Sequence, residues 1–244
     1  MGKVKIKRKS TLIDMTAMSD VTVLLLTFFM LTSTFLQKEP TTVITPSSVS
    51  EIKVPTANVA SILVSPEGKV FLSVAGEADP NVAGGEWASE PIRAQVLRTA
   101  AQNYEKFTGK KTGITEGDIA KFSKINMFGV PLDAMHSFLE LSQTKQDEFI
   151  GDMSNPQVGI PLKEIVYTDQ DGNKVVTNEF QIWMRAIYNS GNENLQSAMK
   201  AGEGIAVKAD RGTPYTTVHE VLDNLQTMKM NRFSVMTALK TEKD

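Results

Sequence analysis

The chain has 244 residues, of which 41% are hydrophobic and 22% are charged, a balance that fits one large or two small globular domains and excludes a protein with many membrane-spanning helices. Residues 1–36 hold five basic and two acidic side chains, which leaves residues 37–244 with 21 basic and 26 acidic ones. This weakly acidic remainder argues against nucleic acid as the main ligand, and the absence of cysteine excludes disulfides, thiolate catalysis and thiolate metal sites.

The first predicted element is an apolar helix over residues 12–36, preceded by a basic tail at residues 1–11. Only Asp14 and Asp20 interrupt this run with a charge. About 20 helical residues cross a hydrocarbon core of about 30 Å, so we expect a single transmembrane helix. A cleaved signal peptide also has a basic start, but its apolar core is shorter and ends in small residues that this run lacks. Because the basic residues come first, the amino terminus is predicted to be cytoplasmic and the rest to lie beyond the inner membrane.

Asp20 lies within the predicted membrane-spanning segment, where a charged side chain is energetically unfavourable. A charged side chain at the centre of a membrane helix costs about 2.5–3.5 kcal/mol. Asp14 is better placed to cap the helix start, so Asp20 lies about a turn and a half further in. Thr27 and Thr34 follow Asp20 at intervals of seven residues, and Thr16 precedes it by four, so the four share one slowly drifting face. This polar stripe favours a proton-carrying carboxylate over a structural one, with the threonines as supporting groups.

The stretch KRKSTLIDMTAMSDVTVLLLTFFMLT at residues 7–32 resembles the amino terminus of the ExbD/TolR family. The family pattern reads I-D-M-T-P-M-x-D-V, and the chain follows it with alanine in place of proline. The resemblance implies that Asp20 corresponds to the family's proton-coupling aspartate. It also implies an inner-membrane motor without a cofactor, in which two copies of the chain sit inside a ring of multi-span ExbB/TolQ-like subunits. Such a motor uses the proton-motive force to act on a TonB- or TolA-like protein, and the external domain could also hold peptidoglycan.

Residues 37–57 are predicted to form an extended periplasmic linker. They contain three prolines and many serine and threonine residues, a composition that cannot build a core. The last part of this segment, IKVPTA, is similar to a V-x-L-P-x-A stretch of the family. The resemblance implies that Val54 and Pro55 help to gate the proton path, and a plain spacer is the open alternative.

Residues 58–244 are predicted to form an α+β periplasmic domain in which a small sheet packs on helices. Apolar runs at residues 60–65 and 69–74 flank a Pro-Glu-Gly turn and predict a hairpin. A strand at 204–210, an amphipathic helix at 214–228 and a strand at 232–239 complete the sandwich. The strand and helix resemble a second family motif, which implies a structural or partner-binding role for Lys208, Asp210, Tyr215 and Asp223.

Between these parts, residues 76–169 are predicted to be an insertion that typical members of the family lack. Helices are expected at residues 91–107, 115–124 and 131–150, the second with a capping box from Thr115 to Asp118. A hairpin at 164–176 and a helix at 178–188 follow. The insertion could bind a partner, the cell wall or neighbouring ring subunits, or it could only enlarge the domain.

No other constellation predicts chemistry. The run DQDGNK at residues 169–174 lacks the glycine and glutamate that a calcium loop needs at its sixth and twelfth positions. Glu140 and Glu220 near His136 and His219 are interpreted as ordinary surface partners, so we interpret both histidines as structural. With no hydrolase or phosphate-loop motif, we expect neither an enzyme nor a metal site. The alternatives to the transport motor are a TolR-like envelope-maintenance subunit and a passive anchor for a peptidoglycan- or protein-binding module.

Overall fold

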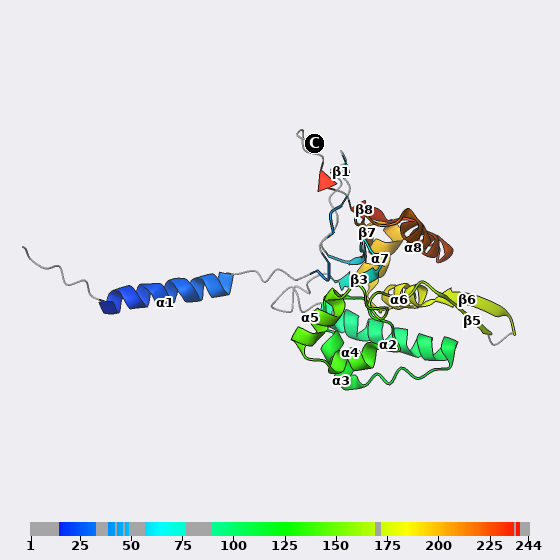
Figure 1. Cartoon of the computed structure of the whole chain (residues 1–244), viewed down its shortest axis with the longest axis horizontal. Helices are drawn as coiled ribbons and strands as arrows, with labels where there is room; N and C mark the ends of the chain where they lie inside the picture. Colours follow the sequence, from blue (N-terminus) through cyan, green and yellow to red (C-terminus); the bar gives the residue numbers. More distant parts are fainter. Residues whose placement is uncertain are drawn as a thin grey trace, which may run out of the picture. The chain divides into compact units, whose positions relative to one another are not determined.

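The computed structural model describes residues 15–32, 39–41, 43–45, 47–48, 57–76, 89–168, 172–236 and 238–239 (Figure 1). The chain divides into two compact units, Met1–Lys38 and Glu39–Asp244. In the first unit the structure describes one helix, α1 (Met15–Thr32). Among the described residues, no helix meets the combined requirements of length and apolarity for crossing a membrane.

A five-stranded sheet with the order β4-β3-β2-β7-β8 forms the centre of the second unit. The strands are β2 (Val59–Val64), β3 (Val70–Ala75), β4 (Met127–Phe128), β7 (Ile205–Ala209) and β8 (Ser234–Met236). The predicted hairpin is confirmed, because β2 and β3 pair in antiparallel register around a turn in which the N–H of Gly68 donates to the carbonyl of Ser65. Strand β7 runs parallel to both β2 and β8. Helix α8 (Tyr215–Thr227) makes the crossover that parallel strands require, as predicted.

Strands β2 and β3 are buried on both faces of the sheet. Their side chains alternate between the two faces and so contribute to two separate apolar clusters. Ile62 and Leu72 point to the main cluster, which the helices cover. Leu63 and Phe71 point the other way and pack with Val158 in a smaller cluster. This double burial explains why β2 and β3 are mainly apolar and do not alternate strictly between apolar and polar residues.

The helices of the predicted insertion pack in the main core with the sheet. The first two are α2 (Ser89–Thr108) and α3 (Glu116–Phe122), and α6 (Glu179–Tyr188), which follows the insertion, packs in the same core. The rings of Phe122 and Trp183 stack, and the Phe128 ring packs tilted against both, with centroids 4.6–5.8 Å apart. Because these rings come from α3, β4 and α6, the inserted helices and the sheet form one folding unit.

The single helix predicted over residues 131–150 is wrong. The structure has two short helices there, α4 (Met135–Glu140) and α5 (Gln143–Gly151). Leu141 between them has an extended backbone, with φ −68° and ψ 151°. The side-chain amide of Gln146 donates to the carbonyls of Phe138 and Leu141, at 3.3 and 3.0 Å, and so stabilises the backbone at the break.

Five further elements complete the description of the second unit. A predicted hairpin is confirmed as β5 (Glu164–Thr168) and β6 (Lys174–Asn178), and the helix α7 (Glu193–Ala201) was not predicted. The strand expected over residues 232–239 is described as β8 and the shorter β9 (Ala238–Leu239). Strand β9 pairs with β1 (Ser47–Ser48), so part of the predicted linker pairs with the carboxyl-terminal region.

Candidate functional site

Helix α1 carries many large apolar side chains that are exposed. The exposed residues are Met18, Val21, Val23, Leu24, Leu25, Leu26, Phe28, Phe29, Met30 and Leu31, each at least half exposed. They include consecutive residues, so they surround the helix rather than form one stripe. A helix that is apolar all round is typical of one buried in protein or lipid, so α1 requires an external cover.

Asp20 is the single charged residue among the 18 residues of α1. Its side chain is exposed in the isolated chain. Thr27 lies about 20° from Asp20 around the helix axis, one heptad further along. The Thr27 hydroxyl donates to the carbonyls of Val23 and Leu24, at 3.0 and 2.9 Å, so its hydrogen is satisfied by its own helix. Its oxygen still has acceptor capacity on the face that carries Asp20.

The remaining predicted residues of this path are only partly described. Thr16 lies in α1, where the backbone is described but the side chain is not. Thr34, Val54 and Pro55 lie outside the described residues. The structure therefore brings Asp20 and Thr27 onto one face and leaves the rest of the stripe and the gate as predictions.

Lys208 and Asp210, two residues of the second family motif, bind residues at the start of the second unit. The Lys208 ammonium lies 2.7 and 2.8 Å from the two carboxylate oxygens of Glu39. The Asp210 Oδ2 accepts the backbone N–H of Ile44 at 2.6 Å, and the N–H of Arg211 donates to the Ile44 carbonyl at 2.8 Å. Glu39 and Ile44 are thus fastened to the end of β7. Neither Glu39 nor Ile44 was predicted as a partner, because 169 and 166 residues separate each from its contact.

The other two motif residues lie on the exposed face of α8. Tyr215 is 76% exposed, and its ring makes an edge contact with His219 at a centroid distance of 5.7 Å. His219 Nδ1 lies 2.7 Å from Asp223 Oδ2, so this histidine pairs with Asp223 rather than with Glu220. The three side chains form a strip along successive turns, and an exposed tyrosine in such a strip suits a contact with another protein.

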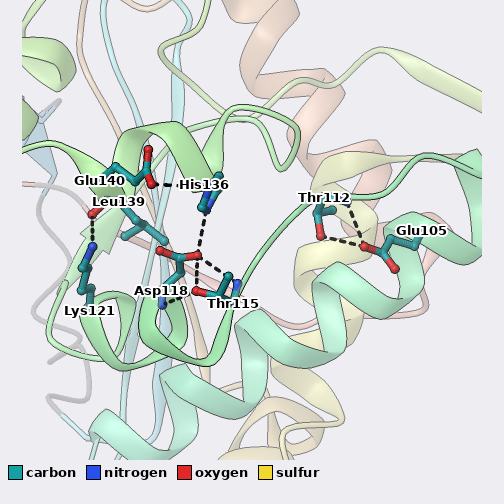
Figure 2. Close-up of polar contacts among 8 residues, drawn as sticks. All are labelled: Glu105, Thr112, Thr115, Asp118, Lys121, His136, Leu139 and Glu140. Atoms are coloured by element: carbon teal, nitrogen blue, oxygen red, sulfur yellow. Dashed lines mark hydrogen bonds and ion pairs between the residues drawn. The ribbon is translucent and has the colours of Figure 1, made fainter.

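A second polar cluster connects α3 to α4, and Figure 2 shows it in close-up. The predicted capping box is confirmed: the Thr115 N–H and hydroxyl donate to Asp118 Oδ2 at 2.9 and 2.7 Å. His136 Nδ1 lies 2.8 Å from the same oxygen, and His136 Nε2 lies 3.7 Å from Glu140. Asp118 was missed as a partner of His136, and no local spacing in the sequence would have shown it.

The electrostatics of this cluster indicate a structural role. Burial alone raises the pKa of Asp118, but the hydrogen bonds from Thr115 and the neighbouring His136 outweigh it, so the pKa lies below its ordinary value. The Thr115 hydroxyl donates to Asp118 and not to His136, which differs from a hydrolase triad. Among the described residues, no group of three or more histidine and acidic side chains could hold a metal ion.

Glu179 is a buried carboxyl group that the sequence did not single out. It begins α6, is 4% exposed and accepts the backbone N–H of Leu132 at 2.6 Å. Burial raises its pKa to about 7, helped by the negative charge of Asp133 and opposed by the Leu132 hydrogen bond. This group affects stability rather than chemistry, because its bond joins the 130–134 segment to the helix that fills the core.

Comparison with protein families gives a match at the amino-terminal side of the chain. A family model described as biopolymer transport protein ExbD/TolR matches residues 7–121. The matched region includes α1 with Asp20, the segment held by Lys208 and Asp210, the β2–β3 hairpin, α2 and α3 up to its last residue but one. No curated protein and no solved structure matches the chain.

Proposed function

The chain belongs to the ExbD/TolR family, and from this we propose that it couples the proton-motive force to mechanical work at the inner membrane. At the level of the family it is an energy-transduction subunit of biopolymer transport, a class associated with the inner membrane and without enzymatic members. The finer proposal is an ExbB–ExbD-type motor that acts on a TonB-like partner for transport across the outer membrane.

The observation that carries the proposal is a lone carboxylate, Asp20, on a helix whose apolar surface needs an external cover. Ionised, such a group costs about 2.5–3.5 kcal/mol inside a bilayer. One charge moved through 100 mV is worth about 2.3 kcal/mol. The two energies are of similar size, so the potential is large enough to drive a cycle in which Asp20 is protonated, passes an apolar surface and is ionised again. Thr16, Thr27 and Thr34 support the same face, and Val54 and Pro55 gate its outer end.

The proposed topology follows from charge and from the cover that α1 needs. Residues 12–36 cross the inner membrane with the basic tail in the cytoplasm, and the second unit lies in the periplasm. The apolar surface of α1 packs against a ring of multi-span ExbB/TolQ-like subunits together with α1 of a second copy. The periplasmic unit engages the TonB- or TolA-like protein, and peptidoglycan is a further ligand of the same unit.

The contacts of Lys208 and Asp210 support a mechanical connection. Six residues separate Thr32, the end of α1, from Glu39. Glu39 and Ile44 are fastened to the end of β7. A displacement of α1 therefore has a short covalent path to the sheet, and Tyr215 and Asp223 on the adjacent helix α8 are placed to present the movement to a partner.

The test compares two carboxylate-to-amide variants in cells that lack the native gene. Asp20→Asn is expected to abolish energy-dependent uptake through the outer membrane while the protein accumulates in the membrane at the normal level. Asp14→Asn is the matched control and is expected to preserve uptake. Sensitivity to detergent in place of an uptake defect would assign the chain to the TolR-like branch, and normal function of Asp20→Asn in both assays would favour the passive anchor.

A further inference from the structure

A pocket of about 540 Å³ lies where α6, α7 and α8 of the second unit end. Ten residues line it, and none of them is acidic. Four of them are cationic: Arg185, Lys200, Lys229 and Arg232. Such a concentration of one charge around a single opening is uncommon in a unit whose net charge is negative, and it calls for a physical explanation.

The four cations have no carboxylate partner within the described part of the chain. The salt bridges found there join other residues. Lys200 instead lies 5.7 Å from the ring centroid of Tyr188 and 3.4 Å from Gln196 Oε1. Arg232 packs its aliphatic part over Gly202, where a side chain as small as alanine would approach it to 2.6 Å. Both contacts hold a cationic side chain at the pocket without neutralising its charge.

Helix termini give the simplest explanation for these cations, and it accounts for part of the charge. The carboxyl end of a helix carries about half a negative charge, which nearby cations stabilise. Three such ends at the pocket amount to about one and a half negative charges, against four positive ones. An excess of more than two positive charges is left, and an anionic ligand can use it.

Lys229 adds a second observation. Helix α8 ends in a Schellman motif, in which the N–H of Met230 donates to the Leu225 carbonyl and the N–H of Lys229 donates to the Gln226 carbonyl, at 2.9 and 2.8 Å. The residue at the left-handed position of this motif is usually glycine, yet here Lys229 has a φ of +62°. The fold therefore accepts a strained backbone at the one residue that brings a fourth cation to the pocket.

The rest of the lining identifies the class of ligand. Tyr188 and three methionines, Met199, Met228 and Met230, supply apolar and polarisable surface. A free phosphate or another small oxyanion would gain no binding energy from that apolar surface. A peptide that carries both acidic and apolar side chains uses the cations and the methionines together. We propose that this pocket binds an acidic peptide segment of a partner protein.

The proposal adds a binding site to the function proposed above and does not depend on Asp20. The probe is a short fluorescein-labelled peptide of alternating glutamate and leucine, titrated with the full-length chain in nanodiscs of neutral lipid and followed by fluorescence anisotropy. Binding is expected to weaken at least about tenfold in Arg185→Gln/Lys229→Gln. The matched control, Lys163→Gln/Lys174→Gln, removes the same charge from two exposed residues outside the pocket and is expected to bind like the unmodified chain.

Lys229→Gly separates binding from folding. It removes one cation and places glycine where the left-handed backbone favours it, so the melting temperature is expected to rise by about 2–4 °C while peptide binding weakens. Three outcomes would overturn the proposal: equal losses in the two double variants, equal binding of a lysine–leucine peptide, and displacement of the probe by inorganic phosphate at a similar concentration. Because Asp20→Asn should leave peptide binding intact, failure of this proposal is distinguishable from failure of the motor.

Discussion

Removal of the Asp210 carboxylate should release the segment that follows the membrane helix without unfolding the sheet. In Asp210→Ala, the backbone N–H of Ile44 loses its acceptor, which lies 2.6 Å away. A hydrogen bond to a charged group is worth about 1.5–3 kcal/mol, and solvent around this exposed contact reduces the value to about 1–2 kcal/mol. Exchange of the Ile44 amide hydrogen should therefore become about 5- to 30-fold faster.

Hydrogen–deuterium exchange of the full-length chain measures this change directly. Lys208→Met should have a smaller effect at Ile44, because the half-exposed ion pair with Glu39 is worth only about 0.2–1 kcal/mol. Asp223→Ala, which removes an exposed carboxylate from α8, serves as the control and should leave Ile44 unaffected. The attachment we describe would be refuted if Asp210→Ala exchanged at the unmodified rate, or if Lys208→Met produced the larger change.

Two further predictions concern buried carboxyl groups. The folded pKa of Glu179, about 7, lies above its ordinary 4.5, so the folded state binds more protons between these values and stability should fall by about 3 kcal/mol as pH rises through that window. Glu179→Gln, which keeps an acceptor for the Leu132 N–H, should remove this fall in thermal melts from pH 4.5 to 8; an unchanged pH profile would contradict the assignment. Thr115→Val removes the hydroxyl that caps α3 and should cost about 0.5–2 kcal/mol at pH 7. The lowered pKa of Asp118 stabilises the fold above the pKa that this group has in the unfolded chain, and the stabilisation is lost as pH falls through the folded pKa. The difference in melting temperature between Thr115→Val and the unmodified chain should therefore shrink in acid. A difference that stays constant with pH would count against this role of Thr115.

Elements whose ends contain recognisable turn or capping residues could be predicted from the local sequence. The β2–β3 hairpin has a Pro-Glu-Gly turn, and α3 begins with a capping box whose hydrogen bonds the structure contains. Helix α7 was overlooked although Asn192 caps its start and Gly202, with φ +96°, ends it. The break between α4 and α5 was missed because Gln146 stabilises it from a position that also fits a continuous helix.

The long-range contacts could not be predicted from the sequence. Glu39 meets Lys208 across 169 residues, and Asp118 meets His136 only because α3 and α4 fold against each other. The raised pKa of Glu179 likewise follows from burial at the start of a core helix, and sequence spacing does not show burial of a single carboxyl group. Asp20 stood out for the opposite reason, since a charge inside an apolar run is visible without any tertiary structure.

Proton flux through the reconstituted complex tests the central claim most directly. Vesicles that contain the chain and its multi-span ring partner are given a pH gradient, and the internal pH is followed with a fluorescent dye. Asp20→Asn is expected to reduce the flux to that of vesicles without the complex, while Asp14→Asn is expected to leave it unchanged. Proton flux through the Asp20→Asn complex at the unmodified rate would contradict the account.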